Sequence, residues 1–148
     1  MKALVQRVKK AQVTIENKIV SSIGTGLLVL LGVGHEDTVK DADWLVEKII
    51  NLRIFEDQDG RMNISLHDIN AELMVVSQFT LMGECKKGRR PSYAKAARPE
   101  PARNLYEYFI SRAVEKEISV KSGVFQAMME VSLTNHGPVT LMLDTRAK

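Results

Sequence analysis

The sequence predicts a single mixed α/β domain spanning residues 1–148, with stacked β-sheets and two main helices on one face. Three observations indicate this class. Strand-like segments are numerous, only two segments have helical periodicity, and no repeat, low-complexity tract or linker divides the chain. A length of 148 residues suits one domain. Apolar residues make up 45% and charged residues 26%, which is the balance of a globular protein rather than a disordered one.

Strand patterns dominate the first third of the chain. Residues 2–8 and 12–16 alternate between apolar and polar side chains, as half-buried strands do. A turn at Asn17 leads to a further strand at residues 18–23. Residues 27–33 are almost uniformly apolar, which is typical of a central strand that is buried on both faces.

The first helix is expected after Thr38, which can cap its start together with Asp41 in the capping-box position. Its apolar face recurs at helical spacing through Ala42, Leu45, Val46, Ile49 and Leu52. Residues 57–60 (Asp-Gln-Asp-Gly) predict a turn. They contain part of a calcium-loop pattern but lack its remaining ligands, so we expect no metal site there.

The second half begins with a buried strand at residues 73–76, which runs directly into Ser77-Gln78-Phe79-Thr80-Leu81. Three further strands are expected at residues 120–125, 129–133 and 139–143. So many strands leave sheet edges to be covered, and dimerisation is a common way to cover them.

The second helix is expected over residues 102–117. Pro91, Pro99 and Pro101 predict that the preceding chain stays non-helical through Pro101, because proline disrupts a helix interior. The face of this helix that we expect to be buried consists of Leu105, Tyr106, Phe109 and Ala113.

The sequence lacks the usual catalytic and cofactor-binding patterns. Its histidines have no zinc-ligand spacing, and no G-x-S-x-G elbow of a serine esterase is present. Gly32-Val33-Gly34 lacks both the third glycine of a dinucleotide loop and the lysine of a phosphate loop. Cys85 has no obvious histidine partner that would make it a nucleophile. We therefore expect neither a metal ion nor a cofactor.

The sequence also argues against membrane insertion and secretion. Its longest apolar run, residues 26–33, is far shorter than the roughly 20 residues that cross a bilayer. The N-terminus becomes polar before a long apolar stretch develops, so no signal peptide is visible. A single cysteine excludes an internal disulfide framework. These features predict a cytoplasmic protein.

Basic residues are clustered, although the net charge is only +3. One cluster, the basic loop, consists of Lys86, Lys87, Arg89 and Arg90. A second cluster consists of Arg7, Lys9 and Lys10. Such clusters are either ordinary solvated surface or contacts for nucleic-acid phosphates. Aromatic residues make up only 5%, which argues against an extended platform for base stacking.

Two polar segments stand next to strongly apolar strands. Ser77, Gln78 and Thr80 lie where a buried strand emerges, a place where α/β proteins often carry their sites. Alternatively, their hydroxyls satisfy the backbone of a loop. Residues 135–138 (Asn-His-Gly-Pro) interrupt two strands and are either a tight hairpin connection or part of a site.

Together these two segments resemble those of the D-aminoacyl-tRNA deacylases, also called D-tyrosyl-tRNA deacylases. The similarity extends over essentially the whole chain, including residues 1–8, 26–32, 51–55 and 87–92. The resemblance implies a mixed α/β fold and a symmetric homodimer whose active sites lie at the subunit interface. It also implies that the substrate is D-aminoacyl-tRNA, whose ester bond is hydrolysed. Glycyl-tRNA would enter as well, because glycine has no side chain to exclude.

The resemblance further implies roles for individual residues. Gly137 and Pro138 would form a cis pair that reaches from one subunit into the pocket of the other. Its backbone would hold the amino group of the substrate and occupy the space that an L side chain needs. His136 receives no role, because the family usually has other residues at this position. The catalytic segment would be Ser77, Gln78, Phe79 and Thr80, and the basic loop would contact tRNA.

Two mechanisms stay open for the catalytic segment. Backbone N–H groups near Phe79 and Thr80 could stabilise the oxyanion, with Gln78 orienting the substrate and the ribose 2′-hydroxyl helping to activate water. Alternatively, Thr80 is a covalent nucleophile, for which the sequence supplies no base. Two other interpretations of the chain are a non-catalytic module that binds an RNA end through the basic loop, and a small-molecule esterase with Ser77 or Thr80 as its nucleophile.

Overall fold

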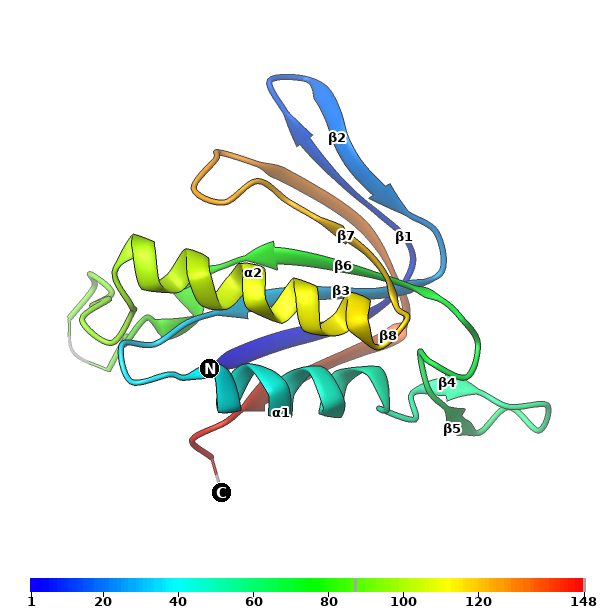
Figure 1. The fold of residues 1–148 in the computed structure, drawn as a ribbon. Helices are drawn as coiled ribbons and strands as arrows, with labels where there is room; N and C mark the ends of the chain where they lie inside the picture. Colours follow the sequence, from blue (N-terminus) through cyan, green and yellow to red (C-terminus); the bar gives the residue numbers. More distant parts are fainter. Residues whose placement is uncertain (87, 148) are drawn as a thin grey trace.

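A six-stranded mixed sheet forms the centre of the computed structural model, which describes residues 1–86 and 88–147. The strands follow the order β2 (Lys18–Ile23), β1 (Lys2–Ile15), β3 (Gly26–Gly32), β6 (Glu72–Ser77) and β7 (Ser119–Ser122), and β8 (Glu130–Asp144) pairs with β1. All pairs are antiparallel except β3–β6 and β6–β7. Helices α1 (Val39–Ile50) and α2 (Pro99–Glu115) lie side by side on one face (Figure 1). The mixed α/β class with two helices on one face is confirmed.

Strand β1 is continuous, whereas the sequence predicted two separate strands in this region. Against β8, Val8 faces Asn135 and Lys10 faces Thr134. Lys9 is therefore an extra residue without a partner, which makes a β-bulge. The bulge interrupts the apolar alternation without ending the strand, and this is why the pattern suggested a break.

The bulge lets one strand contribute to two hydrophobic cores. Before it, Ala3 and Val5 pack towards the helices, and after it, Ala11 and Val13 pack on the opposite face of the sheet. The second core fills the space where the sheet folds over itself and consists of Val8, Ala11, Val13, Ile23, Leu28, Met74 and Val76. The two end strands of the path, β2 and β7, contact each other. The predicted stacked sheets are thus two layers of one bent sheet.

Strand β3 is buried on both faces, as its uniform apolar sequence predicted. Leu27, Val29 and Leu31 belong to the core beneath the helices, whereas Leu28 belongs to the second core. Its neighbour β6 has the same arrangement, with Val75 facing the helices and Val76 facing the second core. These two central strands carry the candidate site at their ends.

Helix α1 begins with the predicted capping pair. Thr38 donates from its backbone N–H and from its hydroxyl to Asp41 Oδ2, at 2.8 and 2.9 Å. Burial alone would raise the pKa of Asp41, but hydrogen bonds from Thr38 and Thr145 lower it below its ordinary value. The predicted apolar face is buried except for Leu52, which lies beyond the end of the helix at Ile50.

Helix α2 begins at Pro99, earlier than the sequence predicted. The expectation that prolines keep the chain non-helical through Pro101 is wrong. N–H groups in the first turn have no intrahelical acceptor, so proline there forfeits no hydrogen bond. The predicted buried face holds for Tyr106, Phe109 and Ala113, and Leu105 is partly buried.

Strand β8 is also continuous, and the strands predicted at residues 129–133 and 139–143 are both parts of it. The prediction that they are separate is wrong, and so is the alternative of a tight hairpin connection at residues 135–138. Both of its halves pair with β1. Gln6 faces Thr140 and Val8 faces Asn135, so residues 136–139 stand opposite a single residue of β1 and bulge out of the ladder. The strand expected at residues 120–125 ends earlier, at Ser122.

A small hairpin, β4 (Phe55–Glu56) and β5 (Met62–Ile64), lies apart from the main sheet. The turn predicted at residues 57–60 connects its strands and is confirmed. Within residues 1–86 and 88–147, no group of three or more His, Cys, Asp or Glu side chains is arranged to hold a metal ion. No helix in this part of the chain is long and apolar enough to cross a membrane.

Candidate active site

Strand β6 ends at the segment that the sequence predicted to be catalytic. Ser77 is its last residue, and Phe79–Met82 form the short 3₁₀ helix η1. The N–H of Gln78 donates to the Leu31 carbonyl at 2.8 Å, which holds the segment against the end of β3. Gly32 permits this close approach, because a Cβ there would lie 3.1 Å from the Gln78 carbonyl oxygen. The segment is therefore held in place through its backbone.

The side chains of this segment form a small polar and aromatic surface. Gln78 Nε2 donates a hydrogen bond to Thr80 Oγ1. Phe79 is 57% exposed and packs edge-on against Tyr93, with the ring centroids 5.1 Å apart. The N–H groups of Phe79 and Thr80 open η1, so the helix provides no carbonyl for them. Two backbone donors next to an exposed ring can stabilise a negative charge on a bound group.

Neither hydroxyl of the segment has a basic partner. Within the part of the chain that the structure describes, Thr80 Oγ1 is hydrogen-bonded by the amide of Gln78, and no histidine or carboxylate side chain bonds to Thr80 or Ser77. A hydroxyl needs an adjacent general base to act as a nucleophile. Within the described part of one chain, neither hydroxyl therefore has such a base.

The Gly137–Pro138 pair lies in the bulge of β8, and its peptide bond is cis. Asn135 closes the base of the bulge. Its Oδ1 accepts from the Val139 N–H at 2.8 Å, and its Nδ2 donates to the Thr140 hydroxyl at 3.0 Å. Gly137 has a φ of +139°, a backbone conformation that residues other than glycine rarely adopt. Both residues are exposed, so their backbone projects from the strand.

Within one chain, the catalytic segment and the Gly-Pro bulge do not meet. Strands β1 and β3 lie between β6 and β8. Three strand spacings amount to about 14 Å. The segments are also offset along the strands, because Ser77 is in register with Leu31 and Ala3, whereas the bulge stands opposite Arg7. One chain alone does not assemble both segments into a single pocket.

The sequence pattern of the family described as D-Tyr-tRNA(Tyr) deacylase matches residues 4–144. The chain belongs to this family. A relative from Syntrophus aciditrophicus (strain SB), named D-aminoacyl-tRNA deacylase, is 58% identical over 146 residues, covering 99% of this chain and 98% of the relative. A relative of the same name from Geobacter sp. (strain M21) is 55% identical over 148 residues, covering 100% of this chain and 99% of the relative.

Solved structures are similar to this chain in fold. One, described as "c-Myc DNA Unwinding Element Binding Protein", is 42% identical and superposes with a TM-score of 0.93, covering 99% of this chain and 100% of that chain. Another, described as a probable eukaryotic D-amino acid tRNA deacylase, has a TM-score of 0.82 and covers 96% of this chain and 97% of that chain. At 18% identity the second structure supports the fold alone.

A buried arginine supports the Gly-Pro bulge in this member of the deacylase family. The side chain of Arg7 is only 4% exposed, and its Nη2 lies 3.5 Å from Glu56 Oε1. Its Nε donates to the His136 carbonyl at 2.8 Å, and its Nη1 donates to the Ile54 carbonyl at 2.6 Å. A Cβ on Gly137 would lie 3.0 Å from Arg7 Nη2. The guanidinium thus packs directly beneath the backbone of the bulge.

Our sequence analysis missed this arginine. It placed Arg7 with Lys9 and Lys10 in a surface cluster, and this is wrong for Arg7 because only the two lysines are exposed. The available signal was periodicity, since Arg7 continues the alternation of the buried residues Ala3 and Val5. A charged residue at a buried position needs partners, and here backbone carbonyls supply them.

The end of β6 is held from the helix side as well. The Val75 carbonyl accepts from the Tyr106 hydroxyl at 2.9 Å and from the Gly123 N–H at 3.0 Å. Burial raises the pKa of Tyr106 to about 12, so this hydroxyl keeps its proton beyond pH 10. Two donors on one carbonyl fix the strand two residues before Ser77.

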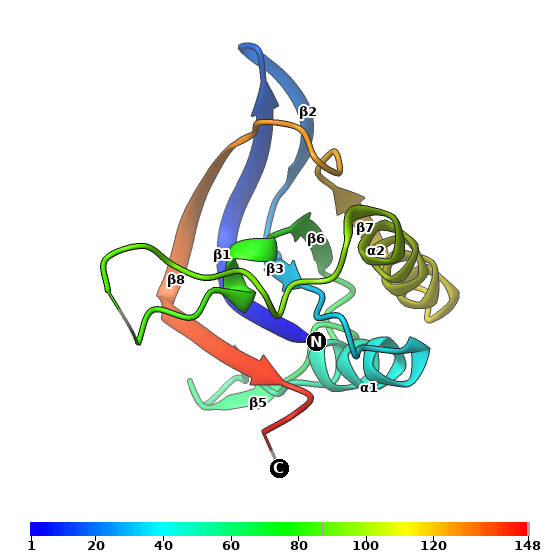
Figure 2. The same ribbon diagram turned by 90° about the vertical axis from the view of Figure 1, so that its left-hand side faces the viewer.

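The basic loop follows η1 and projects beyond the sheet (Figure 2). Lys86, Arg89 and Arg90 are exposed, and Lys87 lies outside the described residues. Glu84 and Ser92 tie the base of the loop through paired backbone hydrogen bonds of 2.8 and 3.0 Å. The described cations of the loop therefore remain available to an anionic partner.

Proposed function

We propose that this chain is a cytoplasmic D-aminoacyl-tRNA deacylase, which hydrolyses the ester bond between a D-amino acid and its tRNA. The observation that carries this proposal is the catalytic segment at the end of β6, where two backbone N–H groups without a helical acceptor lie beside the exposed Phe79. Full-length relatives at 55–58% identity are named for this activity. The geometry suits ester hydrolysis, because the reaction develops negative charge on the carbonyl oxygen.

The N–H groups of Phe79 and Thr80 would receive that oxyanion. A single donor of this kind typically contributes about 2.7–4 kcal/mol to the transition state. Gln78, held by its contact with Thr80, would orient the ester. Water would be activated with help from the ribose 2′-hydroxyl of the substrate, which fits the missing base next to the segment. The water oxygen bonds to the carbonyl carbon, and the bond from that carbon to the ribose oxygen then breaks. A proton from the water passes to the leaving ribose oxygen, which yields free amino acid and tRNA.

The complete site would form in a homodimer. Strand β8 pairs with β1 along one edge and leaves Leu133, Leu141 and Met142 exposed. A long strand edge with apolar side chains favours association with another strand-rich surface. The bulge with Gly137 and Pro138 lies on this strand. A second copy would bring its bulge against the catalytic segment of the first, which one chain does not achieve by itself.

Chiral selection would follow from this arrangement. Apolar pockets separate substrates by only about 1–3 kcal/mol for each methylene group, which is too little to protect abundant L-aminoacyl-tRNA. A backbone wall at Gly137 and Pro138 instead blocks the space of an L side chain and makes no contact with a D side chain, whatever its identity. Glycyl-tRNA would be hydrolysed too, because glycine has no side chain that the wall could exclude. The basic loop would add affinity by neutralising tRNA phosphates.

The central test compares hydrolysis of D-, L- and glycyl-tRNA carrying the same tRNA body. Release of the D-amino acid and of glycine, with the L-ester spared, is the expected result. Binding of tRNA without release of any amino acid would favour the nucleic-acid-binding alternative, which the description of the 42% identical structure also suggests. Hydrolysis of simple esters without tRNA, through an acyl-enzyme, would favour the small-molecule esterase.

A heterodimer experiment tests the shared site. Gly137→Ala damages the wall, and Thr80→Pro removes one oxyanion donor while staying within the first turn of η1. If sites cross the interface, a heterodimer of the two variants has one intact and one doubly altered site. It should therefore recover about half of the wild-type rate, although each homodimer is impaired. No recovery in a folded heterodimer would place each site within one chain.

A further inference from the structure

A polar groove crosses the sheet where β2, β1 and β8 lie side by side. It has a volume of about 380 Å³, and its polar lining consists of Lys10, Gln12, Ser22, Ser132 and Thr134. Gln12 stands opposite Ser22 of β2 and Ser132 of β8, and Lys10 stands opposite Thr134. Directly opposed side chains point to the same face of a sheet. Neither the catalytic segment nor the Gly-Pro pair is among the described residues that line this groove.

The β-bulge at Lys9 determines that the groove faces outward. After the bulge, Ala11 and Val13 point into the second core. Side chains alternate along a strand, so Lys10 points away from that core. Without the extra residue, Lys10 would share the face of Val8, which also lies in the second core. The bulge therefore turns a row of polar side chains towards solvent.

The lining of the groove offers hydrogen-bond donors. It contains three hydroxyls, one amide and one ammonium group, and none of the described residues that line it is acidic. The Gln12 amide is held only by a long hydrogen bond, in which its Nε2 donates to Thr14 Oγ1 at 3.3 Å. Hydroxyl, amide and ammonium groups can all donate to the oxygens of one phosphate. The lining thus suits an anion with several acceptor oxygens.

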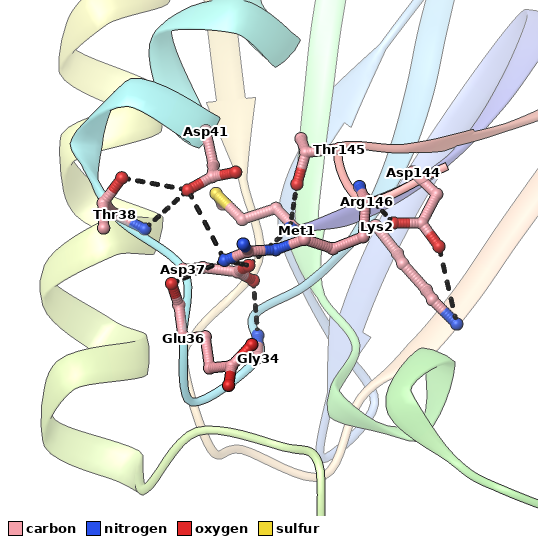
Figure 3. A network of polar contacts seen from close by, with 10 residues as sticks. All are labelled: Met1, Lys2, Gly34, Glu36, Asp37, Thr38, Asp41, Asp144, Thr145 and Arg146. Atoms are coloured by element: carbon pink, nitrogen blue, oxygen red, sulfur yellow. Dashed lines mark hydrogen bonds and ion pairs between the residues drawn. The ribbon is translucent and has the colours of Figure 1, made fainter. Parts of the chain in front are cut away.

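Two lysines supply positive charge at one end of the groove. Lys9 and Lys10 are exposed, and among the described residues no carboxylate lies within 4.0 Å of either ammonium group. Lys2 on the same strand differs, because its Nζ lies 3.9 Å from Asp144 Oδ2 (Figure 3). Glu130, at the start of β8, lies beyond the far end of the groove. The positive charge is therefore concentrated at the end nearest the Gly-Pro bulge.

The groove begins directly beside the bulge that the proposed site takes from a second copy. Thr134 precedes Asn135, which closes the base of the bulge, and Lys10 stands opposite Thr134. Three residues along the strand separate Thr134 from Gly137, which amounts to about 10 Å. In the proposed homodimer, the bulge of one chain meets the catalytic segment of the other. A tRNA whose ester occupies that site would pass the groove of the chain that supplies the bulge.

We propose that this groove, together with Lys9 and Lys10, binds phosphates of the tRNA acceptor arm. The inference rests on the proposed deacylase function and adds a second contact surface to the basic loop. For any one ester, the basic loop comes from the chain with the catalytic segment, whereas the groove comes from the chain with the Gly-Pro bulge. Phosphate contacts position a nucleic acid without reading its bases, so the groove would accept tRNAs of different sequence.

Binding of uncharged tRNA tests the groove without hydrolysis. In Lys9→Ala/Lys10→Ala, the dissociation constant at low salt should rise about tenfold, and the slope of log affinity against log salt should fall by about 1.4–1.8. Lys9→Arg/Lys10→Arg keeps the charge and should retain both wild-type values. Ser132→Ala removes a neutral donor, so it should weaken binding about two- to tenfold without changing the slope. Lys2→Ala is the matched control on β1 and should change neither value, because Lys2 is already paired with Asp144.

Heterodimers test where the groove lies relative to the site. One chain carries Thr80→Pro, so the working site combines the intact catalytic segment of the other chain with the bulge of the Thr80→Pro chain. Placing Lys9→Ala/Lys10→Ala on the Thr80→Pro chain should raise KM for D-aminoacyl-tRNA about tenfold and leave kcat within about twofold. The same two substitutions on the chain with the intact segment should leave KM unchanged.

The outcomes separate the groove from the proposed activity. Unchanged binding and an unchanged salt slope in Lys9→Ala/Lys10→Ala would refute the proposal and make these lysines ordinary solvated surface. An equal rise in KM from both placements would also refute it, because diffuse charge would then explain the effect. Binding of tRNA that needs the two lysines, without hydrolysis of any ester, would support the groove and reject the proposed deacylase function.

Discussion

Replacing Gly137 by Ala tests the wall of the proposed site most directly. The φ of +139° lies in a region nearly restricted to glycine, and strain of this kind costs about 1–3 kcal/mol. The new Cβ would also lie 2.8 Å from Val139 Cγ2 and 3.0 Å from Arg7 Nη2. Crowding in a packed site adds about 1–3 kcal/mol. The bulge should respond by shifting away from Arg7, which weakens the hydrogen bond from Arg7 to the His136 carbonyl.

A total of about 2–6 kcal/mol should lower the unfolding temperature by roughly 5–25 °C. We expect slower hydrolysis of D-aminoacyl-tRNA and a smaller ratio of D to L hydrolysis. Gly60→Ala is the matched control, because Gly60 also has a positive φ, +74°, but nothing lies within 4 Å of its Cβ position. It should lose about 1–2 kcal/mol of stability and no selectivity. If folded, dimeric Gly137→Ala keeps the wild-type rate and still spares the L-ester, the wall is elsewhere.

Four further outcomes are expected. Thr80→Ala keeps the backbone donor and should slow hydrolysis only about tenfold, whereas Thr80→Pro should slow it about 10²–10³-fold. Trapping an acyl group on Thr80 would establish covalent catalysis instead. Neutralising all four cations of the basic loop should reduce the slope of log affinity for tRNA against log salt by about 3, and an unchanged slope would make the loop ordinary surface. The pKa of Tyr106 is raised from 10.0 to about 12 in the folded protein. Its contribution to the stability of the fold is therefore complete below pH 10 and is lost as the pH rises to about 12. Alkaline titration of unfolding should show a loss of about 2–3 kcal/mol in this window that Tyr106→Phe lacks. Chelators and Cys85→Ser should each leave most activity intact, and a loss that a divalent ion restores would contradict the proposed chemistry.

Local signals predicted most of the helices and central strands, because burial imposes a period on them. The continuous apolar run of β3 and the capping pair at Thr38 and Asp41 are signals of this kind. The catalytic segment could be placed at a strand end for the same reason, since a buried strand has to emerge into a loop. Its three-dimensional neighbours, such as Tyr93, could not be predicted from spacing.

The errors concern features that depend on a partner strand. A bulge at Lys9 and a larger bulge at residues 136–139 interrupt the alternation as a turn would, and only the pairing of β1 with β8 shows that both strands continue. Arg7 was assigned to the surface because its charge suggested exposure. Its partners, the carbonyls of Ile54 and His136, are remote in sequence, so no local sequence pattern predicts these contacts.

The pairing of β1 with β8 also determines when the sheet can be completed. The two strands join residues 2–14 to residues 130–144. At a synthesis rate of about 5–20 residues per second, β1 is made roughly 6–26 s before its partner β8. During that time the edge of β1 has unpaired backbone groups and the second core lacks the strand that covers part of it. The nascent protein is therefore most open to wrong strand pairing at its first strand, and a chaperone that shields this edge would protect it until β8 arrives.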